Sequence, residues 1–312
     1  MNTLQRLAIS LEMPGGPRVA RRQREGWPAS SRTDIAFFQG SRAQIRYRER
    51  GQGRSLVFVA DPPVTLEQYD ELLELYSREF RVIVFEIPGM GFSTPGRDYD
   101  LRFRPANDGI AEFLRAVVGE PAVLMFSCVA GFIAVDLASR YPELVSHVVL
   151  MQTPSWSQAV RWKHSRDPKG VLSRPFIGQL LMNRLKKTRA PLWFNLALGG
   201  KTPRYQPFCT CAQHSIEQGA GWALASVFQH YLTDQAPPLP PIRQPTLVLW
   251  GLRDHSHATT DTQSSAELAQ RLEIECYDDL GHFPELEDPP RVLLRLQRFL
   301  AETLDAESPR PG

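Results

Sequence analysis

Short runs of apolar and β-branched residues recur along this chain, and between them lie longer stretches whose apolar residues return every three or four positions. A continuous apolar run is typical of a strand buried on both faces, whereas the three-to-four spacing is typical of an amphipathic helix. The runs predict strands at 35–38, 44–48, 55–60, 81–87, 122–126, 147–151, 246–250 and 272–277, and the spacing predicts helices at 66–78, 106–118, 130–140 and 289–303.

These predicted strands and helices alternate from residue 35 onward. Alternating strand and helix units predict an α/β fold, in which a mostly parallel sheet is covered by helices on both faces. The first two strands, 35–38 and 44–48, are short, and we expect them to form an antiparallel pair.

The interval between strands 147–151 and 246–250 interrupts the alternation. It is too long for a loop and contains helical segments, so we expect an inserted helical cap over the carboxyl ends of the strands, where α/β sheets bind ligands. The predicted organisation is a flexible extension at 1–34, an α/β core at 35–152 and 236–304, a helical cap at 153–235 and a tail at 305–312.

The composition is that of an ordinary soluble globular protein, because 42% of the 312 residues are hydrophobic. No apolar run approaches the roughly 20 residues needed to span a membrane, and no secretory signal is recognisable. The four cysteines are not spaced like a disulfide framework, so we expect a cytoplasmic protein. The Cys and His residues of 209–214 have no second such group beside them, and we expect no metal site.

The apolar strand at 122–126 stops at Ser127, and a helical pattern begins directly after Cys128. A strand, a sharp turn and a helix in immediate succession are the context of a nucleophile elbow. The usual elbow pattern is G-x-S-x-G, and this chain has Phe126, Cys128 and Ala130 in place of the glycine, serine and glycine. The sequence therefore predicts Cys128 as a nucleophile, with a small buried thiol as the alternative interpretation.

Other motifs stand at matching places along the same succession of strands and helices. Together they make the chain resemble the α/β-hydrolase superfamily, as a capped member with cysteine at the elbow, from about residue 44 to residue 304. The motifs are Phe-Ser-Cys-Val-Ala-Gly at 126–131, Pro-Gly-Met-Gly-Phe-Ser at 88–93, Trp-Gly-Leu-Arg-Asp at 250–254 and Leu-Gly-His-Phe at 280–283.

The resemblance implies a catalytic triad in the family's chain order of nucleophile, acid and histidine. Cys128 would attack as a thiolate, His282 would take the thiol proton, and Asp254 would orient His282 and stabilise its charged form. Epoxide hydrolases and haloalkane dehalogenases share this layout but carry Asp at the elbow, so Cys128 argues against both activities. We expect His255 and His257 to be solvated loop residues, with a second base as the alternative interpretation of either.

The segment after strand 55–60 departs from the family pattern. Most members carry His-Gly there, and the next backbone N–H helps to form the oxyanion hole, whereas this chain has Asp61, Pro62 and Pro63. Pro62 has no N–H to donate, and an ionised Asp61 would repel an oxyanion. The backbone N–H of Val129 is the remaining expected donor, and the loss of one donor costs on the order of 100- to 1,000-fold in rate.

A cysteine nucleophile exchanges acyl groups with a thioester at little thermodynamic cost. We therefore expect an acyl-transfer enzyme, a hydrolase or an acyltransferase, that acts on an ester or, more readily, on a thioester of a largely apolar acyl group. Two other functions stay open: a lyase, isomerase or cyclisation step on a natural product with His282 as acid and base, and ligand binding without catalysis. No Gly-rich phosphate loop is present, so no cofactor is expected.

The predicted cap is basic and rich in tryptophan. Residues 153–235 hold 11 Lys and Arg against 3 Asp and Glu, in a protein whose net charge is +2. These cations could steer a coenzyme A thioester or an acyl carrier protein, or could serve only to solubilise exposed helices. No nucleic-acid motif accompanies them, so we expect neither nucleic-acid nor membrane partners. We expect Trp156, Trp193 and Trp222 to line a substrate pocket.

Overall fold

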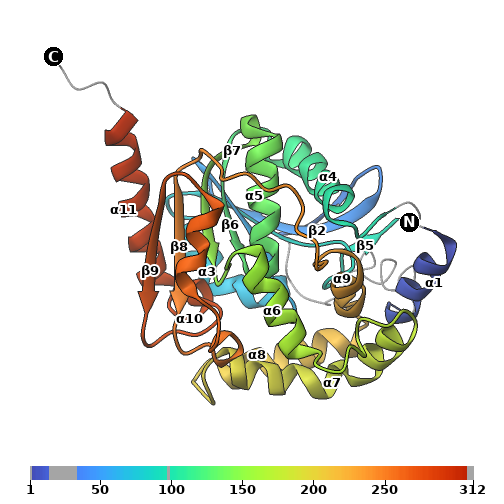
Figure 1. Ribbon diagram of the computed structural model, residues 1–312. Helices are drawn as coiled ribbons and strands as arrows, with labels where there is room; N and C mark the ends of the chain where they lie inside the picture. The colour runs from blue at the N-terminus through green and yellow to red at the C-terminus, as the bar shows by residue number, and fades with distance from the viewer. Residues whose placement is uncertain (1, 14–33, 97–98, 308–312) are drawn as a thin grey trace.

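A nine-stranded sheet forms the centre of the computed structural model, which describes residues 2–13, 34–96 and 99–307 (Figure 1). The strands are ordered β1-β2-β4-β3-β6-β7-β8-β9, and β5 pairs with β2 beside this path. Their bounds are β1 Ile35–Gln39, β2 Ala43–Arg50, β3 Ser55–Ala60, β4 Arg81–Glu86, β5 Thr94–Pro95, β6 Ala122–Ser127, β7 Val145–Met151, β8 Thr246–Gly251 and β9 Leu272–Tyr277.

The sheet is parallel from β4 through β3 to β9, and β2 runs antiparallel to β1, β4 and β5. The predicted fold class, a mostly parallel sheet with an antiparallel first pair, is confirmed. Because parallel strands share one direction, the residues that follow β3, β6, β7 and β8 gather at one edge of the sheet. Asp61, Cys128, Gln152 and Asp254 all stand just beyond these strand ends.

Helices cover both faces of the sheet, with α4 and α5 on one face and α3 and α11 on the other (Figure 1). The predicted helices are all present, and their bounds shift by a few residues: a 3₁₀ turn precedes α3, and a π turn extends α4. The helix bounds are α1 Thr3–Glu12, α3 Asp70–Tyr76, α4 Phe103–Phe113, α5 Gly131–Arg140, α6 Trp156–Arg166, α7 Ile177–Ala197, α8 Tyr205–Glu217, α9 Leu224–His230, α10 Pro284–Glu287 and α11 Pro289–Glu307.

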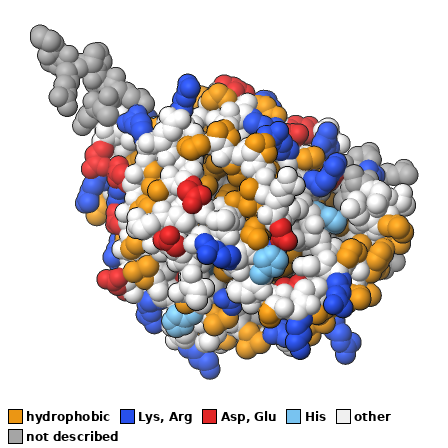
Figure 2. Space-filling view, viewed as in Figure 1, with side chains coloured by type: hydrophobic (Ala, Val, Ile, Leu, Met, Phe, Trp, Pro, Cys, Tyr) orange, Lys and Arg blue, Asp and Glu red, His pale blue; other side chains and the backbone are white. Residues whose placement is uncertain are grey.

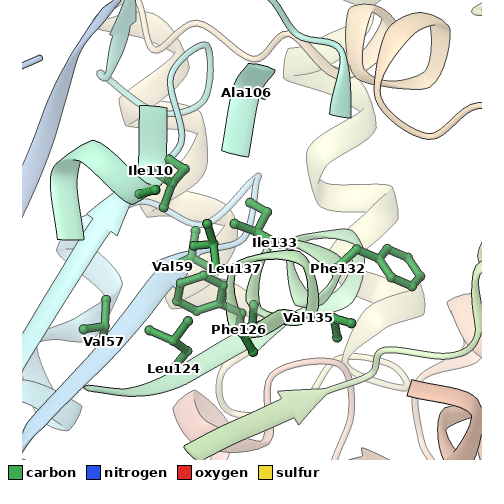
Figure 3. Close-up of a cluster of buried hydrophobic side chains, with 14 of the residues drawn as sticks. Val57, Val59, Ala106, Ile110, Leu124, Phe126, Phe132, Ile133, Val135 and Leu137 are labelled. Carbon is green, nitrogen blue, oxygen red and sulfur yellow. The ribbon is translucent and has the colours of Figure 1, made fainter. Parts of the chain in front are cut away.

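Side chains of the central strands alternate between two hydrophobic cores. Val57 and Val59 of β3 pack with Phe126 of β6 beneath α4 and α5 (Figure 3). Leu56 and Phe58 of β3 point to the opposite core, beneath α3 and α11. A strand that is buried on both faces has no polar side, which is why these strands read as unbroken apolar runs.

Four helices, α6 to α9, lie between β7 and β8 and form the predicted helical insertion. In the view of Figure 1 they lie below the sheet, beyond the carboxyl end of β6. Lys and Arg side chains lie along the lower edge of the molecule in Figure 2, where Figure 1 places α7 and α8. The exact limits of this cap, 153 and 235, stay a prediction.

The N-terminal segment differs from the flexible extension predicted for 1–34, because residues 3–12 form helix α1. The carboxylate of Glu12 at its end is fully buried and accepts hydrogen bonds from the N–H groups of Ala225 and Ser226, at the start of α9. Residues 14–33 lie outside the described ranges. At the other terminus α11 continues to Glu307, into the predicted tail. No helix in the described ranges is long and apolar enough to cross a membrane.

Candidate active site

Cys128 stands at the tip of a sharp turn between β6 and α5, and its backbone has a φ of +52°. This left-handed conformation costs a non-glycine residue about 1–2 kcal/mol. The hydroxyl of Thr153 supports the turn by donating to the Cys128 carbonyl oxygen at 3.0 Å. Gly131 leaves room for that hydroxyl, since a Cβ there would fall 2.2 Å from the Thr153 oxygen. The fold thus holds the thiol in a strained position.

Cys128 lies on the wall of a cavity of about 500 Å³ between the sheet edge and the cap. A cavity of this size accommodates a small organic molecule. Its lining is mostly apolar and includes Met90, Ile133 and Phe228. The polar and charged lining residues are Asp61, Asn107, Ser165, Arg166, Asp167, Lys186 and Arg189.

The cavity opens between α6 and α7. Among its described lining residues, only Ser165 of α6 and Arg189 and Leu192 of α7 are exposed, so these three mark the mouth. The half-buried guanidinium of Arg166 stands beside Ser165 and donates to the Ser256 carbonyl oxygen at 2.7 Å. The entrance is therefore basic, whereas the inner wall carries the carboxylate of Asp61.

His282 is fully buried behind this wall, and both of its ring nitrogens face a carboxylate. Nδ1 lies 2.5 Å from Oδ2 of Asp254, and Nε2 lies 3.1 Å from Oδ2 of Asp61. The Cys128 sulfur, an Asp61 oxygen and a His282 nitrogen lie within 4.8 Å of one another. The structure therefore brings together Cys128, His282, Asp254 and Asp61, all of which the sequence singled out.

Asp254 is held by three donors. Besides His282, its carboxylate accepts from the Nε2 amide of Gln152 and from the N–H of Ser256, each at 2.8 Å. Gln152 also bonds the backbone of Gly251 through both ends of its amide. Gln152 has a φ of +51° and no exposed surface, and no motif in the sequence identified it.

Burial and charge shift the pKa of each group in this cluster. Burial disfavours the charged form of His282, but the carboxylates of Asp254 and Asp61 outweigh it and raise the His282 pKa well above its usual value. Burial raises the pKa of Asp61, although the hydrogen bond to His282 opposes this. Burial also raises the pKa of the Cys128 thiol, and the nearby charge of Asp61 adds to it. The carboxylates thus favour a protonated His282, whereas burial favours a neutral thiol on Cys128.

Two of the three predicted pocket tryptophans line the cavity, namely Trp193 and Trp222. The Trp193 ring also lies 5.0 Å from the His282 ring, edge to face. The structure corrects the placement of Trp156, which packs against Phe132 and donates its indole N–H to a backbone carbonyl away from the cavity. Its large apolar ring is used to seat the cap on the core. Trp162, which the sequence did not single out, lines the cavity instead.

A family model described as the alpha/beta hydrolase fold matches residues 63–289. The chain belongs to this family. As an α/β-hydrolase-fold protein it is placed among the enzymes of this superfamily, in agreement with the expectation from the sequence.

Named relatives of this α/β-hydrolase-fold protein are distant. It is 23% identical to (E)-2-((N-methylformamido)methylene)succinate hydrolase of Acinetobacter baylyi, over 82% of this chain and 94% of the relative. It is 24% identical to pimeloyl-[acyl-carrier protein] methyl ester esterase of Stenotrophomonas maltophilia, over 82% and 96%. The structure of epoxide hydrolase VrEH1 from Vigna radiata superimposes with a TM-score of 0.70 at 13% identity, over 88% and 100%. At that identity the superposition shows the fold alone.

The three residues that the sequence assigned to the oxyanion position, Asp61, Pro62 and Val129, all line the cavity of this hydrolase-fold protein. Pro62 lines the cavity and, as a proline, offers no N–H. Val129 also lines the cavity, and its N–H favours the thiolate form of Cys128. Asp61 presents an oxygen to His282 where the family's pattern places no carboxylate.

One expectation about the neighbouring histidines is wrong. His255 is exposed, but His257 is buried, and its ring stacks on Trp162 at 5.4 Å and on His282 at 5.5 Å. Burial lowers the pKa of His257 to about 3, so this ring is neutral. His257 thus forms an uncharged spacer between the tryptophan of the cavity wall and the charged His282.

Two groups of donor atoms in the described chain are close enough together to suggest a metal site. They are Asp61, Cys128 and His282, and Asp254, His257 and His282. Both groups depend on a ring nitrogen of His282, and each nitrogen already faces a carboxylate oxygen at hydrogen-bond distance. We therefore interpret the cluster as a proton-transfer network.

Proposed function

We propose that this protein transfers the acyl group of an ester or thioester through a covalent intermediate on Cys128. The observation that carries the proposal is a thiol held in a left-handed turn on the wall of an apolar cavity, with a charged imidazole and two carboxylates behind it. A strained, buried nucleophile beside titratable groups of shifted pKa is typical of catalytic sites.

The reaction would proceed in two acyl-transfer steps. The thiol of Cys128 gives up its proton, and its sulfur attacks the acyl carbonyl carbon. The bond from that carbon to the leaving oxygen or sulfur then breaks, and the leaving group takes the proton. The acyl group, now a thioester on Cys128, passes to water or to another nucleophile. The Val129 N–H and the positive charge of His282 would stabilise the oxyanion in each step.

A thioester fits this site better than an oxygen ester. With Pro62 at the second donor position, the oxyanion has weaker support, and a missing donor costs on the order of 100- to 1,000-fold in rate. A thioester carries a better leaving group and exchanges with a cysteine without a large change in free energy. The apolar lining favours an acyl group that is itself apolar, and each buried methylene would contribute about 0.8 kcal/mol to binding.

The basic mouth supports a carrier-bound substrate. Arg166 and Arg189 stand where an acyl chain that reaches Cys128 would leave its carrier in solvent. Phosphate groups of a coenzyme A or acyl-carrier arm would meet these cations there. One distant relative, the Stenotrophomonas maltophilia esterase, is named for an acyl-carrier-protein substrate. We propose an anionic carrier thioester as the substrate class.

Intact-protein mass spectrometry tests the covalent intermediate. The protein is mixed with a series of medium-chain acyl thioesters, quenched in acid and weighed. We expect an acyl adduct that maps to Cys128, that is absent from Cys128→Ala and that persists in Cys276→Ala, the exposed cysteine control. The proposal fails if the wild-type protein turns over a thioester with no adduct and Cys128→Ala is equally active.

A second candidate function is favoured by the contact between Asp61 and His282. Two acid–base groups beside an apolar cavity can move protons on a bound substrate without a covalent step, as a lyase, isomerase or cyclase requires. Turnover that survives Cys128→Ala but is lost in His282→Ala would favour this reaction over acyl transfer.

A further inference from the structure

Both ring nitrogens of His282 lie within hydrogen-bond distance of a carboxylate. An imidazole accepts a proton only at an unprotonated ring nitrogen. Here Nδ1 faces Asp254 and Nε2 faces Asp61, both within hydrogen-bond distance, and an imidazolium satisfies both carboxylates by donating to each. In a triad of the usual kind, Nε2 is directed at the nucleophile alone and receives its proton. Here the His282 ring interacts with the Cys128 thiol as well, so Asp61 shares Nε2 with the thiol. An imidazolium that donates to both carboxylates is already protonated at the position where that proton would go.

We infer that Asp61, and not His282, is the general base that takes the proton of Cys128. This inference rests on the proposed acyl transfer. Asp61 lines the cavity, stands directly after β3 and has an oxygen within 4.8 Å of the Cys128 sulfur. A buried carboxylate is a stronger base than one in solvent, because burial disfavours its charged form. Apo distances of this kind commonly shorten when substrate binds.

The proton and charge balance closes without any further reactant. The thiol proton moves to the Asp61 carboxylate, and the sulfur attacks the acyl carbonyl. Asp61 is then a neutral acid, so it no longer repels the oxyanion. When the tetrahedral intermediate collapses, Asp61 returns the proton to the departing thiolate. In the second half Asp61 takes a proton from the attacking water and gives it to the sulfur of Cys128. His282 stays positively charged throughout and offsets the negative charge.

The surroundings of Asp61 agree with this role. His282 and the thiol of Cys128 are its polar neighbours at the cavity wall, and Asp254 lies behind the imidazole. Glu285 of α10 is also buried close to this cluster, where burial raises its pKa to about 8, so it stays neutral at pH 7. The hydroxyl of Tyr69 donates its hydrogen bond to the Val59 carbonyl oxygen and not to Asp61. Asp61 is therefore the carboxyl group that contacts the imidazole from the cavity side.

The rate of acyl-enzyme formation in Asp61→Asn distinguishes Asp61 from His282 as the general base. In Asp61→Asn the side chain keeps its shape, but it can no longer accept a proton. If Asp61 is the base, the rate of acyl-enzyme formation falls by about 10²- to 10⁴-fold. If His282 is the base, removing its second carboxylate frees Nε2 to accept, and the rate stays the same or rises.

The test is rapid-quench mass spectrometry of Cys128 acylation by one acyl thioester, run with EDTA present. Wild type is compared with Asp61→Asn and with Asp279→Asn, in which an exposed carboxylate paired with Arg291 is removed. We expect the fall only in Asp61→Asn. In Asp61→Ala, formate in the medium should restore part of the rate by entering the vacated space as a free carboxylate.

A second readout shows that the variant site is intact. The pH dependence of iodoacetamide alkylation gives the pKa of the Cys128 thiol, which should fall in Asp61→Asn because a neighbouring negative charge is gone. Acylation of Asp61→Asn at the wild-type rate, with that pKa lowered, would overturn the role of Asp61 and leave the acyl-transfer proposal standing. An unchanged thiol pKa would likewise overturn it. A wild-type protein that forms no adduct overturns both.

Discussion

Gln152→Leu is the substitution that most directly tests how the charged cluster is held. Gln152 is fully buried and directs its amide both at the carboxylate of Asp254 and at the backbone of Gly251. Leucine has a similar volume and fills the space, but it can neither donate to Asp254 nor accept from Gly251. The substitution therefore removes hydrogen bonds and creates little cavity.

The cost follows from the bonds that are lost. A hydrogen bond to a charged acceptor, here the 2.8 Å bond to Asp254, contributes about 1.5–3 kcal/mol. The N–H of Gly251 loses its 2.8 Å acceptor and stays buried, which costs about 1–3 kcal/mol. Together the free energy of unfolding should fall by roughly 3–5 kcal/mol, since the two terms share one side chain. For a chain of 312 residues that lowers Tm by roughly 5–8 °C.

Thermal and urea unfolding measure this difference, with Gln244→Leu as the matched control. Gln244 makes one side-chain bond, to the Ala138 carbonyl, and lies away from the cluster, so its loss should cost about 1 kcal/mol. The pKa of Asp254 is held far below its usual value, so its contribution is full above about pH 4 and is lost as pH falls. The difference in the free energy of unfolding between wild type and Gln152→Leu should therefore become smaller in acid. A loss no larger than that of Gln244→Leu would refute the reasoning.

Two further predictions concern the cap. Arg189→Ala should raise KM for an acyl-coenzyme A by about 3- to 10-fold at low salt, and Arg184→Ala, on the same helix but outside the cavity lining, should change it less than twofold. A matching rise in KM for a phosphate-free thioester would contradict the carrier assignment. Burial raises the pKa of Glu12 to about 7, so its share of stability is full below about pH 4.5 and is lost as pH rises through 7. From pH 4.5 to pH 8, the free energy of unfolding of Glu12→Gln should therefore rise by on the order of 3 kcal/mol relative to that of wild type. Parallel profiles of Tm against pH for the two proteins would contradict this.

Most of the fold was readable from the sequence, because its signals are local. The strands β3, β4, β6 and β8 are buried on both faces, so each appears as an unbroken apolar run in the chain. The helices on either face carry the periodic spacing of an amphipathic stripe. Helix α1 was missed, although Asn2 and Gln5 form a capping box at its start. Its packing against α7 and α9 of the cap is a tertiary contact that the sequence does not show.

The sequence also determined which chemical groups are available at the site. Cys128, Asp254 and His282 stand in the chain order of a known catalytic arrangement, and Pro62 lacks its N–H in any structure. A short motif directly after a strand predicts which side chain lies at the edge of the sheet. For that reason the elbow and the two other members of the predicted triad could be named in advance.

Only the tertiary structure decided how these groups are connected. Asp61 and His282 are 221 positions apart, and no local pattern encodes that Nε2 faces a carboxylate as well as the thiol. The burial of His257, the support of Asp254 by Gln152, and the displacement of Trp156 from the cavity have the same origin. Hydrogen-bond geometry and the pKa of a buried group depend on every element that packs around it, and a sequence pattern describes one element at a time.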